Sequence, residues 1–133
     1  MIRYRYVSEL TPPAPFVKVT LLGPQTGNRL ESLPAQVDTA ADRTVLPGRV
    51  IRQLNLVEDG RLQFQGFAGE VVELPIFLVS VQVHDLSPIL IRAALGEGEP
   101  FILLGRDVLN SYRVLLDGPQ LSAEIDHGDC AAR

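Results

Sequence analysis

The sequence of 133 residues is poor in cysteine, lysine and tryptophan. Its one cysteine, Cys130, excludes an intrachain disulfide and therefore a disulfide-stapled secreted domain, so a reducing compartment fits better. Lys18 is the single lysine, the arginines are scattered, and 12 basic residues stand against 16 acidic ones. This balance leaves no charge pattern suited to nucleic acid or to an anionic membrane surface, and we expect neither as a partner.

Long apolar runs are missing as well. No stretch approaches the roughly 20 residues that a membrane helix needs, and residues 1–6 lack the apolar core of a secretion signal. We therefore expect a cytoplasmic location. Hydrophobic residues still make up 46% of the chain, which is enough for one domain with a core, while the chain is too short for two ordinary domains.

Glycine and proline, with 11 and 10 residues, divide the chain into short runs rich in Val, Ile, Leu and Phe. Such runs predict a mostly β protein. The predicted strands span residues 16–22, 29–37, 61–65, 70–83, 89–95, 101–104, 113–116 and 120–125, with short helices at 47–54 and 107–112. We expect an extended arm at residues 1–13, one domain at 14–126 and a frayed tail at 127–133.

The segment of residues 35–42 carries candidate chemistry. It places Asp38 and Asp42 after a β-like run, among small residues that let a substrate backbone approach a carboxylate closely. Taken by itself, the segment is more typical of a strand-to-turn junction, where Asp and Thr are common.

Two further segments follow it in the chain. Residues 66–69 form a short connection with glycine at both ends, which is typical of a hairpin tip. Residues 101–109 form an apolar run that passes through Gly105 and Arg106 into the predicted second helix.

In this order the three segments resemble the retropepsin-like aspartic proteases, the family of the retroviral proteases and their bacterial and cellular relatives. There, an apolar strand leads into Asp-Thr/Ser-Gly-Ala, a flap hairpin follows, and an apolar run ending in Gly-Arg opens a short C-terminal helix. The resemblance covers residues 14–125. It implies an all-β fold, a single-lobe acid-protease β-barrel with a flap hairpin and one short C-terminal helix.

The resemblance also implies a reaction, the hydrolysis of peptide bonds in an extended peptide. Two facing carboxylates share one proton; the ionised one activates a water and the protonated one polarises the scissile carbonyl. Because the chain has one such motif, it must pair with a second copy, so the implied enzyme is a C2 homodimer with Asp38 and its symmetry mate on the axis. No cofactor or metal takes part.

Individual residues carry over by position. Asp38 corresponds to the catalytic carboxylate, and Thr39 to the hydroxyl that ties the two active-site loops together. The implied substrate-binding residues are Ala40, Ala41, Asp42 and Arg43 in the first segment and Gly66, Phe67, Ala68 and Gly69 at the flap tip. Asp42 and Arg106 correspond to an ion pair that braces the loop. Arg43 is expected at a pocket rim where it favours acidic side chains, and Phe67 either contacts the substrate or packs within its loop.

One position departs from the family, since Ala40 stands where the motif has glycine. If the site needs a positive φ, alanine costs about 1–2 kcal/mol there; if it needs space, a methyl group intrudes at the floor. A second hypothesis is therefore a catalytically weak or inactive dimer that binds peptide or serves in assembly. A third is a small β-barrel with another role. His127 and Cys130 lack a second ligand pair, so we expect no metal site.

Overall fold

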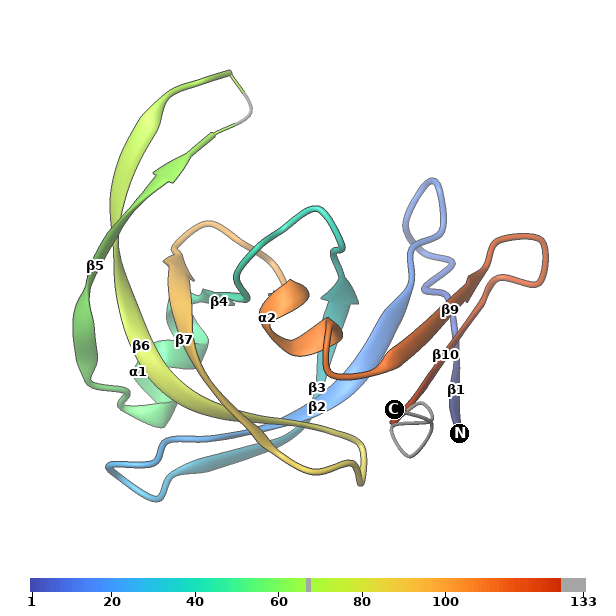
Figure 1. The fold of residues 1–133 in the computed structure, drawn as a ribbon, viewed down its shortest axis with the longest axis horizontal. Helices are drawn as coiled ribbons and strands as arrows, with labels where there is room; N and C mark the ends of the chain where they lie inside the picture. Colours follow the sequence, from blue (N-terminus) through green and yellow to red (C-terminus); the bar gives the residue numbers. More distant parts are fainter. Residues whose placement is uncertain (67, 128–133) are drawn as a thin grey trace, which may run out of the picture.

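The computed structural model describes residues 1–66 and 68–127. Its elements are β1 (Ile2–Arg5), β2 (Phe16–Leu22), β3 (Arg29–Val37), β4 (Val45–Pro47), α1 (Gly48–Leu54), β5 (Glu58–Gln65), β6 (Val71–Val83), β7 (Ile89–Gly96), β8 (Ile102–Leu104), α2 (Arg106–Leu109), β9 (Arg113–Asp117) and β10 (Ser122–Asp126) (Figure 1). All the predicted strands and both helices are confirmed, with shifted ends. Two short strands, β1 and β4, were not predicted.

Six strands close into a barrel. The large sheet runs in the order β2-β3-β8-β4-β7-β6-β5, and β2 also pairs with β6. This extra pairing joins the two sides of the sheet and leaves β5 outside, paired only with β6 as a long hairpin (Figure 1). The all-β barrel predicted from the sequence is therefore confirmed, and α2 is its short C-terminal helix.

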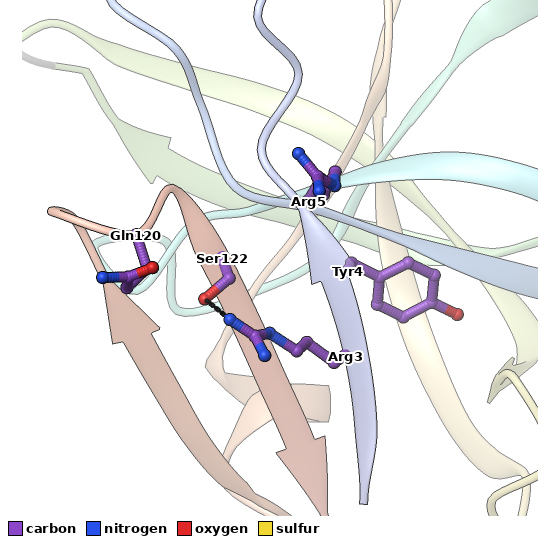
Figure 2. A pocket seen from close by; sticks show the side chains of 5 residues that line it. All are labelled: Arg3, Tyr4, Arg5, Gln120 and Ser122. Atoms are coloured by element: carbon purple, nitrogen blue, oxygen red, sulfur yellow. Dashed lines mark hydrogen bonds between the residues drawn. The ribbon is translucent and has the colours of Figure 1, made fainter.

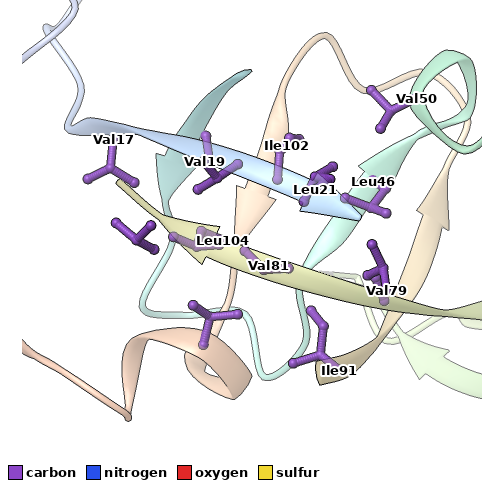
Figure 3. Close-up of a cluster of buried hydrophobic side chains, with 14 of the residues drawn as sticks. Val17, Val19, Leu21, Leu46, Val50, Val79, Val81, Ile91, Ile102 and Leu104 are labelled. Carbon is purple, nitrogen blue, oxygen red and sulfur yellow. The ribbon is translucent and has the colours of Figure 1, made fainter. Parts of the chain in front are cut away.

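Alternating side chains fill the barrel. Along β2, Val17, Val19 and Leu21 are almost completely buried, while Lys18 between them is exposed. This alternation follows from the two-residue period of a strand, which sends successive side chains to opposite faces. The inward side chains meet those of β6, β8 and the β4–α1 region in one cluster (Figure 3). The barrel is thus a packed core, and the chemistry must lie at its rim.

The two ends of the chain form a separate sheet of three strands in the order β1-β10-β9. Ile2 lies opposite Ile125, and Ile125 belongs to the buried core. Residues 2–5 of the predicted arm are thus a strand held by the C-terminal hairpin. The outer edges of β1 and β9 have no neighbouring strand among the described residues. Of the predicted tail, residues 128–133 lie outside the described part of the chain.

Candidate active site

Asp38 lies immediately beyond the end of β3, at the barrel rim. β3 runs parallel to β8, and Val37 is in register with Leu104. The Asp38 N–H continues this ladder by donating to the Leu104 carbonyl at 3.0 Å. The half-buried side chain then accepts the Ala40 N–H at Oδ1, 3.2 Å away. Such an Asx contact fixes the turn that presents the carboxylate.

The loop of residues 38–44, called the site loop here, is held from α2 by Arg106. The Arg106 N–H donates to the Ala41 carbonyl at 2.9 Å, and Nη1 donates to the Thr39 carbonyl at 2.8 Å. A guanidinium suits this role because it carries several donors in a fixed plane. Arg106 therefore braces the site loop through backbone oxygens on both sides of Ala40.

The predicted ion pair between Asp42 and Arg106 is not formed in the described part of the chain. The physical reason is that the Arg106 guanidinium is directed to the Thr39 carbonyl, while Asp42 is exposed. The bracing function predicted for Arg106 is present, but its partner is a main-chain oxygen rather than a carboxylate.

A buried hydrogen-bond network underneath the site loop was not predicted. Thr44 is completely buried, and its hydroxyl donates to Asp107 Oδ1 at 2.7 Å while accepting the Gly105 N–H at 3.1 Å. The Thr44 N–H lies 3.0–3.1 Å from both Asp107 carboxylate oxygens. Its carbonyl accepts the Ala94 N–H at 2.9 Å. Every polar group of this residue is therefore paired, as a buried position requires.

Sequence reasoning missed this network because Thr44 and Asp107 are 63 residues apart and neither belongs to a motif by itself. The available signal was indirect. Thr44 lies just beyond the segment of residues 35–42, and Asp107 lies within the segment of residues 101–109, as the acidic residue in the first turn of α2. Nothing in the sequence indicates that the threonine is buried.

A glycine is required at position 105 because the backbone of the site loop passes very close to it. A Cβ atom built on Gly105 would lie 2.5 Å from the carbonyl carbon of Arg43 and 2.7 Å from its oxygen. These are backbone atoms of the site loop, so they cannot move aside as a flexible side chain does. The glycine of the Gly-Arg pair therefore lets the loop and the start of α2 touch.

Ala40 causes no backbone strain in this structure. The non-glycine residues with positive φ in the described part of the chain are Ser32, Asn55, His84 and Leu121. Ala40 is not among them, so the cost predicted for a left-handed alanine does not apply. The residue is exposed. Any effect of its methyl group must therefore come from the space that it occupies.

The predicted flap is the hairpin of β5 and β6, which extends beyond the barrel on the side where the site loop lies (Figure 1). Near its tip the Gly66 N–H donates to the Glu70 carbonyl at 2.7 Å, and the Gly69 N–H donates to the Gly66 carbonyl at 3.0 Å. Gly69 has a φ of 89°, a conformation that favours glycine. Ala68 is exposed, and Phe67 lies outside the described residues.

Arg43 links the site loop to β7. Its Nη1 donates to the Arg92 carbonyl at 3.3 Å. Arg92 in turn reaches the hairpin, where its Nε donates to Asp59 Oδ2 at 2.6 Å. Arg43 is half-buried. The site loop, β7 and the base of the flap hairpin are thus connected by two arginines.

Two negative observations concern the described residues alone. No three His, Cys, Asp or Glu side chains among them group closely enough to hold a metal ion. None of their helices has the length and apolarity needed to cross a bilayer.

Comparison with solved structures finds retropepsin-like proteins. The chain is similar to a retropepsin-like aspartic protease from Rickettsia conorii, with a TM-score of 0.61, 13% identity, and coverage of 94% of this chain and 91% of that one. It is similar to the EIAV protease complexed with the inhibitor HBY-793, with a TM-score of 0.53, 24% identity, and coverage of 73% of this chain and 86% of that one. It is also similar to the retroviral protease-like domain of Ddi1 from Leishmania major, with a TM-score of 0.53, 17% identity, and coverage of 85% of this chain and 88% of that one.

No family model matches the chain, and no curated protein matches it. The structural likeness, however, spans most of each chain. The barrel, the flap hairpin and the site loop therefore define a protein with the retropepsin-like aspartic protease fold. At these identities the likeness establishes the fold, while the activity is a matter for the site itself.

Proposed function

We propose that the chain is a homodimeric aspartic endopeptidase in which Asp38 and Asp38 of a second copy hydrolyse peptide bonds. The observation that carries this proposal is the position of Asp38. Its carboxylate is presented at the barrel rim by an Asx turn, on a loop that Arg106 and the buried Thr44–Asp107 pair hold in place. A rigidly positioned carboxylate is what acid–base catalysis needs.

The second carboxylate comes from a second chain, because the sequence has one motif of this kind. The terminal sheet is the proposed interface between the two copies. Leu115 and Leu116 on β9 and Leu121 beside β10 are 52%, 41% and 42% exposed, and the outer edge of β9 has no neighbouring strand among the described residues. An open edge with exposed leucines favours pairing with another copy.

The dyad then works as one unit. Two carboxylates a few ångströms apart cannot both ionise, so the pair holds one proton and its apparent pKa values belong to the pair. The ionised member takes a proton from a water that attacks the scissile carbonyl. The protonated member donates a hydrogen bond to that carbonyl. Thr39, whose hydroxyl has no hydrogen bond in the described part of this chain, is free to bind the partner's loop.

The remaining predicted residues bind substrate. Ala40, Ala41 and Asp42 form the floor beside an extended peptide, and Arg43 lies at the rim, where its charge favours acidic side chains. The flap tip closes over the peptide and excludes water. Strand-like backbone pairing of the peptide with flap and floor gives affinity, and alternate side chains enter pockets.

A second candidate function rests on Ala40. Its methyl group is exposed on the site loop, next to the Asp38 turn, and in the dimer it would project toward the bound peptide. If that space is needed for the attacking water or the scissile carbonyl, the dimer binds peptide without cleaving it.

The test is cleavage of a mixed peptide library by the wild type, Asp38→Asn and Ala40→Gly between about pH 3.5 and 7, a range that spans ordinary carboxyl pKa values. Asp38→Asn keeps the turn contact through its amide oxygen but cannot supply the shared charge. We expect specific wild-type cleavage that falls by at least about a hundredfold in Asp38→Asn, the lower end of a general base contribution.

Each outcome decides between the hypotheses, provided that mass measurements show a dimer in every sample. Cleavage that Asp38→Asn leaves intact contradicts the assignment of Asp38. Cleavage by Ala40→Gly alone supports the inactive peptide-binding dimer. No cleavage by either folded dimer contradicts the endopeptidase proposal.

A further inference from the structure

The flap hairpin leaves the barrel at one defined position on β6. From Ile76 to Val81, β6 pairs with β7, whereas residues 71–75 pair with β5 alone. Pro75, the last of these, has no N–H and donates no hydrogen bond to a neighbouring strand. Beyond it the hairpin has two strands, an arrangement with little stability of its own. The direction of the hairpin therefore depends on the contacts at its base.

β5 bends at the same position. From Glu58 to Arg61, β5 advances by three residues while β6 advances by two, from Phe77 to Pro75. The extra residue makes a β-bulge, which bends a strand and interrupts its ladder. Gly60 within the bulge has a φ of 108°, a conformation that favours glycine. The bulge and Pro75 together are called the flap base here.

Two arginines bind three carboxylates at the flap base. Arg61 donates to Glu58 Oε1 through Nη1 at 3.2 Å and to Glu73 Oε1 through Nε at 2.9 Å, so both of its bonds lie within the hairpin. Arg92 belongs to β7, and its Nε donates to Asp59 Oδ2 in the bulge at 2.6 Å. Because β6 lies between β7 and β5, the Arg92 side chain crosses one strand to reach the flap base.

Arg92 also contacts the site loop, through its main chain. Its carbonyl accepts a hydrogen bond from Arg43 Nη1 at 3.3 Å, and two residues further on the Ala94 N–H donates to the Thr44 carbonyl at 2.9 Å. β7 is paired with β6 on one side and with β4 on the other, so its position in the barrel is fixed. Arg92 therefore connects a fixed strand and the site loop to the base of the flap hairpin.

The contact between Arg92 and Asp59 is closer than those of the arginine on the terminal sheet. There, Arg3 donates to the Ser122 hydroxyl at 3.5 Å (Figure 2), and its Nε lies 4.0 Å from Glu124. A distance of 2.6 Å is that of a short, charge-assisted hydrogen bond. The Arg92 and Asp59 side chains are 56% and 39% exposed, and exposed pairs add little to overall stability. Their effect is thus expected on the hairpin rather than on the fold.

We propose that Arg92 is a positioning residue for the peptidase: by holding Asp59, it sets the angle at which the flap hairpin stands over the site loop. This inference rests on the proposed function, in which an extended peptide lies between the hairpin and the site loop and needs both at a fixed separation. When the pair is broken, the hairpin pivots at the bulge and its contacts with the peptide weaken. The bound peptide then leaves faster, while the chemistry at Asp38 is unchanged.

The test is a double-mutant cycle on this pair, with Asp59→Ala, Arg92→Gln and the two combined. Arg92→Gln removes the guanidinium but keeps the carbonyl that Arg43 binds, so it isolates the contact with the flap base. Arg29→Gln is the control, because Arg29 has an exposed partner of its own, Glu31 at 3.0 Å, at the end of β3 remote from the site loop.

Two rates are measured. Hydrogen exchange of residues 61–65 and 71–75 in the free protein reports on the hairpin without any ligand. The dissociation rate of a statine-type inhibitor from the dimer reports on the site. We expect both rates to rise about twofold to fivefold in each single variant, the range that an exposed ion pair supports. The double variant should be no faster, because the pair is already broken, and the control should match the wild type.

The proposal is overturned if hairpin exchange stays at the wild-type rate, if the two single effects add in the double variant, or if bound inhibitor leaves no faster. Exchange that quickens equally in β2 of the barrel also overturns it, since that is a general loss of stability. Failure of the proposed function is distinguishable from these results. A dimer that binds no inhibitor contradicts the peptidase, while exchange in the free protein still decides whether Arg92 holds the hairpin.

Discussion

At the scale of single residues, Thr44 and Gly105 contribute as much to the candidate site as Asp38, whose carboxylate the site loop presents. Thr44 joins Asp107 to the Gly105 N–H beneath the site loop, and Gly105 allows the backbones to touch. The motif residues Asp38, Thr39 and Arg106 were recognisable from the sequence because they are consecutive or follow an apolar run. The support beneath them was not, since a long-range hydrogen bond leaves no periodic pattern.

Replacing Thr44 by valine is expected to destabilise the protein. The substitution keeps the shape but removes the hydroxyl, so the Asp107 carboxylate and the Gly105 N–H each lose a buried partner. The free energy of unfolding should fall by about 1–3 kcal/mol, measured by urea denaturation. Thr44→Ser retains the hydroxyl and is the matched control. Equal losses for the two variants would show that packing of the methyl group, rather than the network, is what matters.

Gly105→Ala is expected to displace the site loop. The added methyl group meets the Arg43 backbone at 2.5 Å, closer than unbonded atoms approach. We expect a loss of about 1–3 kcal/mol in unfolding free energy, typical of overpacking, together with lower peptidase activity. Gly118→Ala is the control, because a Cβ there meets nothing within 4 Å. If Gly105→Ala behaves like Gly118→Ala in both assays, the close approach of the two backbones does not require a glycine at position 105.

At the scale of elements, the sequence predicted every strand with a strong apolar pattern and missed the two without one. β4 has three residues, too few to show a period, and it is held by pairing with β7 and β8. β1 alternates polar and apolar residues, but only over four positions. Its strand form depends on β10, which lies at the opposite end of the chain. Pairing at such distance is set by tertiary contacts that local patterns do not contain.

At this scale, we predict that a charge on the C-terminal hairpin weakens the dimer. Leu115→Asp places a charge on the exposed outer face of β9, where the second copy is proposed to pack. The dissociation constant of the dimer should rise by at least about tenfold, measured by sedimentation at several concentrations. Leu90→Asp is the control, because Leu90 is 59% exposed on β7 of the barrel. A dimer that tolerates Leu115→Asp as well as Leu90→Asp does not use this face.

At the scale of the whole molecule, the fold and the order of its parts were predictable, whereas the assembly follows only from chemistry. The barrel, the hairpin and α2 agree with the resemblance seen in the sequence, and the structural comparisons agree with both. The need for a second chain comes from the single Asp38. The account thus depends on one claim, that two chains build one site around a shared pair of carboxylates.

Binding of a statine-type inhibitor, followed by native mass spectrometry, tests this claim most directly, because it reports the site whether or not Ala40 permits turnover. The account predicts one inhibitor bound for every two chains, and loss of that complex in Asp38→Asn with the dimer retained. One inhibitor bound to each chain, or binding that Asp38→Asn leaves unchanged, would contradict it.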